Sequence, residues 1–221
     1  MDIFISTCSY CYKRIFSSDH IFCLECHGLL PRTYFNFSEN NPVADKLRSF
    51  IKLAAAGSFL FYNESEMVQK ILWEIKYNGN TQLAKEIGRL AAARYEDKFR
   101  QTVDMLIPIP LHKAKLQLRG YNQSAIFAEG MSEILKISCN GDILKRRKQT
   151  TSQTHLNRVD RFQNLNQAFH VEKKDSIKGK NLVLIDDVVT TGATLISAGQ
   201  SLLDAGCASL SIYTLAVAFE M

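Results

Sequence analysis

Residues 182–194, Leu-Val-Leu-Ile-Asp-Asp-Val-Val-Thr-Thr-Gly-Ala-Thr, place two adjacent carboxylates directly before a loop of small and hydroxyl-bearing side chains. The four apolar residues predict a buried parallel strand, and the residues after Thr194 have the spacing of a helix. Backbone N–H groups at the start of a helix bind anions, and the helix dipole adds positive potential there. Asp186 and Asp187 can accept hydrogen bonds from vicinal sugar hydroxyls. The segment therefore predicts a site for a phosphorylated sugar.

An ordinary strand-to-helix turn with an acidic N-cap is the alternative interpretation of the same residues. We favour the binding site because paired acids beside a Thr-Thr-Gly-Ala-Thr run are rare by chance. The segment resembles the 5-phosphoribosyl-1-pyrophosphate (PRPP) motif of the type I phosphoribosyltransferases, with four apolar residues, two acids and then small-Thr-Gly-x-Thr. The resemblance implies that Asp186 and Asp187 are the catalytic carboxylates. It also implies that PRPP is bound by Val188, Val189, Thr190, Thr191, Gly192, Ala193 and Thr194.

Two further segments carry groups suited to a diphosphate. A strand is expected at 103–107, and the two prolines of the following Pro-Ile-Pro-Leu-His run predict a rigid loop at its carboxyl end. Ligands bind at that end of the strands in open α/β sheets. At this position, His112 and Lys113 can bind a diphosphate. Arg119 begins the run Arg-Gly-Tyr-Asn-Gln, which opens the next expected helix and adds a guanidinium.

The window 145–161 is strongly basic. It holds six Lys and Arg residues against one acid, so its excess of five equals the formal net charge of +5 of the whole chain. A solvated surface loop is one interpretation, and a nucleic-acid contact is another. Because a phosphate site follows in the sequence, we favour a loop that closes on an anion. We expect Arg147 and Arg161 to cover the diphosphate.

Four cysteines near the start form two C-x2-C pairs separated by eleven residues. Each pair can present two thiolates to one tetrahedral ion, and two pairs complete a structural zinc site. A redox dithiol is the alternative, but it would need a single pair on a thioredoxin-like helix. Zinc would replace a core that so short a segment cannot build alone. The predicted Zn2+ ligands are Cys8, Cys11, Cys23 and Cys26.

Together with the two C-x2-C pairs, these motifs resemble the ComF family, the competence-associated phosphoribosyltransferase-like proteins of bacteria. The resemblance runs nearly end to end and includes Leu-Pro at 30–31, Lys-Tyr-x-Gly at 76–79, Pro-x-Pro-Leu-His and Arg-Gly-Tyr-Asn-Gln. It implies a type I phosphoribosyltransferase fold that binds PRPP with Mg2+. It also implies a role in handling incoming single-stranded DNA, with partners in the DNA-uptake machinery.

The apolar spacing predicts an α/β fold with a mostly parallel central sheet flanked by helices. Helices are expected at 67–75, from 83 and at 121–136, and strands at 143–144, 167–171 and 210–217. We divide the chain into a zinc-binding module at 1–32, a connector at 33–50 and a phosphoribosyltransferase-like domain at 51–221.

No apolar run is long enough to span a membrane, since the best one, 53–62, is short and contains a glycine. The first residues also lack the layout of a signal peptide. We therefore expect a cytoplasmic protein, peripheral at the inner membrane only through its partners.

Three functions remain open. The favoured one is a PRPP-binding ComF-type protein acting in DNA uptake. The second is an active phosphoribosyltransferase for a small nitrogenous acceptor. The third is a nucleic-acid-binding scaffold without catalysis, in which the basic window binds the backbone and Phe162 or Tyr121 stacks on bases.

Overall fold

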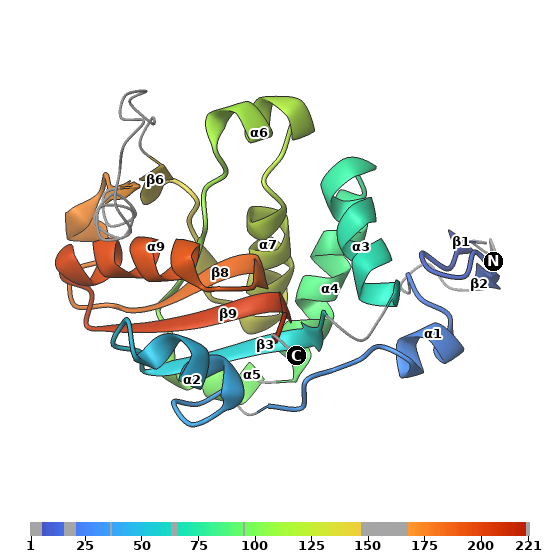
Figure 1. Ribbon diagram of the computed structural model, residues 1–221, viewed down its shortest axis with the longest axis horizontal. Coiled ribbons are helices and arrows are strands. Elements are labelled where there is room, and N and C mark those ends of the chain that lie inside the picture. Colours follow the sequence, from blue (N-terminus) through green and yellow to red (C-terminus); the bar gives the residue numbers. More distant parts are fainter. Residues whose placement is uncertain are drawn as a thin grey trace.

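A five-stranded parallel sheet forms the centre of the protein (Figure 1). The computed structural model describes residues 6–15, 21–35, 37–62, 66–94, 96–146 and 168–219. In spatial order, the strands are β3 (Ala55–Phe61), β9 (Ser209–Val217), β8 (Asn181–Val189), β4 (Met105–Pro108) and β5 (Ser138–Cys139). The expected α/β architecture with a parallel sheet is confirmed.

One side of the sheet is covered by a helical layer. Its helices are α3 (Glu66–Tyr77), α4 (Thr81–Ala93), α5 (Glu96–Thr102) and α7 (Gln123–Leu135). The apolar stripe predicted for the first of these helices is buried at every position, namely Met67, Val68, Ile71, Leu72 and Ile75. Helices α4 and α7 approach closely where two glycines, Gly88 and Gly130, face the backbone of the opposite helix.

The other side of the sheet packs against α2 (Pro42–Arg48) and α9 (Ala193–Asp204). Helix α2 lies in the segment expected to be a connector. Its N-cap, Asn41, accepts hydrogen bonds from the N–H groups of Val43 and Ala44 at 2.9 and 3.0 Å. Val43, Ala44 and Leu47 are buried in this layer. The segment 33–50 thus contributes a packed helix beside the sheet.

The remaining elements are short. The antiparallel pair β1 (Ser6–Thr7) and β2 (Arg14–Ile15) and helix α1 (Leu24–Gly28) contain or flank the four clustered cysteines, and α6 (Lys113–Arg119) follows β4. Strands β6 (Leu144–Arg146) and β7 (Phe169–Val171) form a separate antiparallel pair, and η1 (Lys174–Ser176) is a 3-10 turn. Within the described ranges, no helix combines the length and the apolar character that crossing a membrane requires.

Two local expectations were wrong, and one strand was not expected. The unexpected strand is β3, which lies in the apolar run 53–62 that was too short for a membrane span. Strand β8 continues through both carboxylates to Val189, because its later residues pair with β9. Pro108 lies within β4 opposite Ile185, which is tolerated because the pairing of β4 with β5 ends at Leu106 and leaves Pro108 at an edge on that side.

Candidate active site and metal centre

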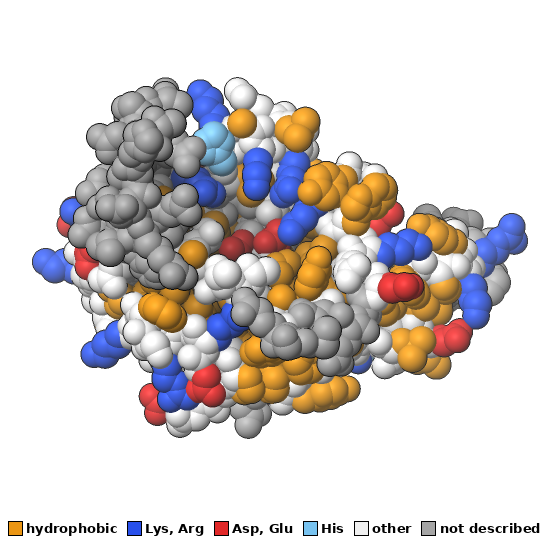
Figure 2. Space-filling model, viewed as in Figure 1, with side chains coloured by type: hydrophobic (Ala, Val, Ile, Leu, Met, Phe, Trp, Pro, Cys, Tyr) orange, Lys and Arg blue, Asp and Glu red, His pale blue; other side chains and the backbone are white. Residues whose placement is uncertain are grey.

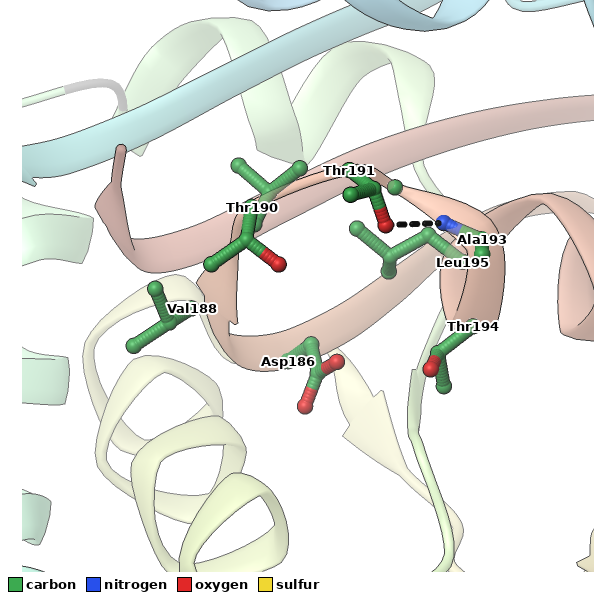
Figure 3. A pocket seen from close by; sticks show the side chains of 9 residues that line it. Asp186, Val188, Thr190, Thr191, Ala193, Thr194 and Leu195 are labelled. Carbon is green, nitrogen blue, oxygen red and sulfur yellow. Dashed lines mark hydrogen bonds between the residues drawn. The ribbon is translucent and has the colours of Figure 1, made fainter. Parts of the chain in front are cut away.

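The carboxyl end of β8 and the start of α9 form a pocket near the middle of the sheet (Figure 3). Gly192 is the N-cap of α9 and has a φ of 80°, a conformation that glycine adopts without strain. Thr191 Oγ1 accepts a hydrogen bond from Ala193 N at 3.5 Å. The pocket is lined by Asp186, Val188, Val189, Thr190, Thr191, Gly192, Ala193, Thr194 and Leu195. All these residues except Leu195 were predicted from the sequence.

Asp186 is fixed by hydrogen bonds from α7 and from the backbone. Its Oδ1 accepts from Ser124 Oγ at 2.9 Å and from Asp187 N at 2.9 Å. Its side chain points into the pocket (Figure 3), although the residue as a whole is only 9% exposed. Burial, followed by the charge of Asp187, raises the pKa of Asp186 to about 7. A bound cation would favour the ionised form of this carboxyl group.

Asp187 is held by two groups from different helices. Its Oδ2 accepts a hydrogen bond from Gln123 Nε2 at 2.8 Å and forms an ion pair with Lys76 Nζ at 2.9 Å. Its Oδ1 accepts from Val188 N at 2.7 Å. The carboxylate therefore has three partners, from α3, α7 and β8, which fix its orientation.

A chain of contacts connects Arg119 to this pair. Arg119 Nη1 donates to Gln123 Oε1 at 2.8 Å, and Gln123 in turn donates to Asp187. The guanidinium also lies 5.4 Å from the centroid of the Tyr77 ring. Figure 2 shows basic side chains gathered over α6 and the end of α3, above acidic side chains in a hollow. This surface suits a ligand with several negative charges.

The other predicted diphosphate contacts are not all placed beside the pair. His112 is the N-cap of α6, and its Nδ1 accepts from Ala114 N at 3.3 Å. Lys113 is exposed at the start of the same helix. Arg147 and Arg161 lie outside the described residues. The structure therefore connects Arg119, the last residue of α6, with the carboxylates and places His112 and Lys113 at the start of that helix, which has no buried side chain.

The four N-terminal cysteines form one cluster. Their Sγ atoms all lie within 4.8 Å of one another, and those of Cys11 and Cys23 are 3.7 Å apart. Thiolates at about 2.3 Å from a tetrahedral ion are about 3.8 Å apart, so the cluster suits a metal such as zinc. Burial raises the pKa of Cys8, but hydrogen bonds from the backbone of Cys11, Cys23 and Tyr10 and from the Cys11 side chain outweigh it and bring the pKa to about 6. A thiolate at this position favours metal binding.

Comparison with known proteins identifies the family to which this chain belongs. The model of the family described as phosphoribosyl transferase domain matches residues 76–218. The chain belongs to this family.

Sequence similarity to curated relatives extends beyond that domain. Over 214 residues, the chain is 28% identical to competence protein F of Haemophilus influenzae, with 95% of this chain and 89% of the relative covered. It is 27% identical over 217 residues to DNA utilization protein YhgH of Escherichia coli O157:H7, with 94% and 88% covered. These relatives confirm the resemblance to the ComF family. A hypoxanthine phosphoribosyltransferase structure from Staphylococcus aureus is similar over 62% of this chain and 64% of that chain, with 18% identity and a TM-score of 0.40.

The phosphoribosyl transferase match includes residues that the sequence analysis did not assign a role. It begins at Lys76 and includes Gln123 and Ser124, and these three side chains hold the carboxylate pair. Lys76 and Gln123 belonged to motifs that the sequence analysis quoted, whereas Ser124 follows such a motif directly. The polar residues at the start of α7 were the signal in the sequence that could have indicated a role in the site. That they hydrogen-bond to Asp186 and Asp187 became evident only in the fold. The cysteine cluster lies before the match.

Proposed function

We propose that this ComF-type protein binds PRPP together with Mg2+ at the carboxyl end of β8 and acts in handling single-stranded DNA during natural transformation. The assignment of PRPP as the ligand rests on the buried carboxylate pair beside a small-residue loop at the start of a helix. The DNA role is supported by the names of the relatives, competence protein F and DNA utilization protein. The protein would work in the cytoplasm and reach the inner membrane through partners in the DNA-uptake machinery.

In our proposal, each part of PRPP has its own contacts in the pocket. Asp186 and Asp187 accept hydrogen bonds from the ribose hydroxyls, and residues 188–194, from the end of β8 to the start of α9, bind the 5-phosphate. Mg2+ prefers oxygen ligands and neutralises the diphosphate. Basic side chains and one imidazole cover that diphosphate and exclude water, and in our proposal they are Lys113, Arg119, Arg147, Arg161 and His112.

We further propose that Cys8, Cys11, Cys23 and Cys26 bind a structural Zn2+. The mutual Sγ distances support this assignment, because they match what four thiolates need around one tetrahedral ion. Four protein ligands leave no open position for a substrate, so the role of the ion is to hold the small module together.

A working phosphoribosyltransferase is the second candidate, and the family match favours it. Transfer of a phosphoribosyl group passes through a positively charged, oxocarbenium-like sugar as the C1–O bond to the diphosphate breaks. Such a reaction needs positioning and charge stabilisation more than a nucleophilic side chain, and the carboxylate pair can supply both. The acceptor in this case would be a small nitrogenous compound.

Calorimetric titration of PRPP with Mg2+, with and without short single-stranded DNA, tests the proposal. We expect saturable binding whose affinity changes when DNA is present. Binding that DNA leaves unchanged would favour the transferase. Failure to bind PRPP under any condition would contradict the assignment of the site.

A further inference from the structure

Aromatic and cationic side chains alternate along one exposed surface between the cysteine cluster and the carboxylate pair. We call it the α3 face, and it consists of Tyr12, Lys70, Trp73, Tyr77 and Arg119. Lys70 Nζ lies 4.3 Å from the centroid of the Tyr12 ring, and the Trp73 and Tyr77 centroids are 6.3 Å apart. Lys70 and Trp73 are three residues apart in α3, so they are neighbours on the helix surface. At the far end, Arg119 contacts Tyr77.

The rings of this face are open to solvent. Tyr12, Trp73 and Tyr77 are 61%, 51% and 64% exposed, although the opposite side of α3 is completely buried in the core. Within the described part of α3, the exposed large hydrophobic side chains are both aromatic. Figure 2 shows hydrophobic and basic side chains next to each other over this region. Exposed aromatic groups in a continuous surface commonly mark a binding site.

We propose that the α3 face binds single-stranded nucleic acid, with bases stacking on Tyr12, Trp73 and Tyr77 and phosphates pairing with Lys70 and Arg119. Proteins that hold single strands combine such rings with cations that follow the backbone. The inference rests on the proposed DNA role and names the surface that carries it. Tyr121, predicted as a stacking residue, instead donates its hydroxyl to the Ile75 carbonyl.

A protein partner is the competing occupant, because Trp, Tyr and Arg are also common in the centres of protein interfaces. Such centres are packed around apolar neighbours and are depleted of lysine. On the α3 face, each end of the aromatic run has a cation against a ring, Lys70 on Tyr12 and Arg119 on Tyr77. This alternation fits a polyanion with stackable bases better than a protein surface.

Trp73 provides a direct test because it is the single tryptophan of the chain. We expect a short oligothymidylate, which forms no secondary structure of its own, to quench the tryptophan fluorescence saturably. The quenching should weaken as salt is raised, because the phosphates release counterions on binding. The experiment uses the full chain in its zinc-loaded form.

The affinity of variants for a labelled oligothymidylate, measured by fluorescence anisotropy, tests whether binding occurs at the α3 face. Trp73→Ala and Tyr77→Ala should each weaken binding roughly 5- to 150-fold, the range for loss of one stacking ring. Trp73→Phe retains a ring and should bind within a few-fold of the unmodified chain. Phe50→Ala is the matched control, since Phe50 is 55% exposed but follows α2 on the other side of the sheet. Circular dichroism confirms that each variant is folded.

The outcomes separate this inference from the proposed function. Oligothymidylate binding without a change in Trp73 fluorescence, or binding that Trp73→Ala and Tyr77→Ala leave intact, overturns the α3 face but keeps the DNA role. No oligothymidylate binding by the unmodified chain overturns both. Equal losses in Phe50→Ala and Trp73→Ala would also contradict the assignment, since the effect would not belong to this surface.

Discussion

At the scale of single residues, the site depends on two adjacent carboxylates that reach the same helix. Successive side chains of a strand normally point to opposite faces of the sheet. Here Asp186 and Asp187 both contact the start of α7, through Ser124 and Gln123. The Asp187 N–H donates to the Asp186 carboxylate, while β8 keeps its register with β9 from Asp186 to Val188. Two adjacent carboxylates therefore serve one site, each held by a different residue at the start of α7.

Asp186→Asn is expected to abolish binding of PRPP with Mg2+ while the protein stays folded. The amide keeps the shape of the carboxyl group but removes the charge that a cation requires. Because burial raises the pKa of Asp186, the ionised group costs folding free energy, and the variant should be at least as stable as the parent above pH 7. Calorimetry and thermal unfolding measure both effects. Asp204→Asn, an exposed change in α9, is the control and should bind normally.

The affinity for PRPP with Mg2+ should rise with pH and level off above about 7. The pKa of Asp186 is raised to about 7 by burial and by Asp187, so at lower pH a proton competes with the cation. Affinity should fall up to tenfold for each pH unit below that value. Ser124→Ala separates this titration from that of the ligand phosphates. Its hydrogen bond lowers the pKa, so its loss should move the midpoint upward, and an unmoved midpoint would refute the assignment.

At the scale of elements, the position of α7 decides whether its polar residues reach β8. A Cβ atom at Gly130 would lie 1.9 Å from the Lys85 carbonyl oxygen, and one at Gly88 would lie 2.2 Å from the Phe127 carbonyl oxygen. The two helices can pack this closely only because both positions lack a side chain. Close packing against α4 therefore holds the helix that presents Gln123 and Ser124.

Gly130→Ala should destabilise the protein by about 1–3 kcal/mol, because the new methyl group forces α4 and α7 apart. The shift should also weaken PRPP binding, since Gln123 and Ser124 move with α7. Urea unfolding and calorimetry measure the two effects. Gly141→Ala is the control, as its Cβ would meet Pro108 at 3.7 Å, an ordinary contact. Equal stability of the two variants would be inconsistent with close helix packing.

At the scale of the whole molecule, the cysteine-bearing segment is attached to the helical layer through α3. Lys70 Nζ donates to the Tyr10 carbonyl at 3.0 Å and lies 5.2 Å from the centroid of the Tyr10 ring. Buried Cys8, Phe22 and Leu30 join the same hydrophobic core as α3. The proposed metal site therefore supports one end of the α3 face.

Cys8→Ser should release zinc and make the N-terminal segment sensitive to protease, because three thiolates hold the ion less tightly than four. PRPP binding should remain, since the carboxylate pair and its partners come from other elements. Metal analysis and limited proteolysis provide the readouts. Cys207→Ser, a change at a buried cysteine outside the cluster, should retain its zinc. A purified parent protein without zinc would rule out the proposed ion.

The sequence by itself determined the features that depend on local spacing. The helical stripe of α3, the order of strand, acids and small-residue loop at β8, and the paired cysteines are all patterns within a few residues. Neighbouring residues set these patterns, because helix and strand periods and ligand spacing are local properties. The resemblance to the ComF family rested on the same short motifs.

Only the tertiary structure decided which groups meet. Asp187 joins Lys76 and Gln123, which lie far apart in the chain, because the order of the sheet and the packing of α3 and α7 bring them together. Likewise, α2 packs against the loop before α9, where the Leu47 side chain occupies the space beside Gly192. No local period encodes such contacts, since they depend on how whole helices pack against the sheet.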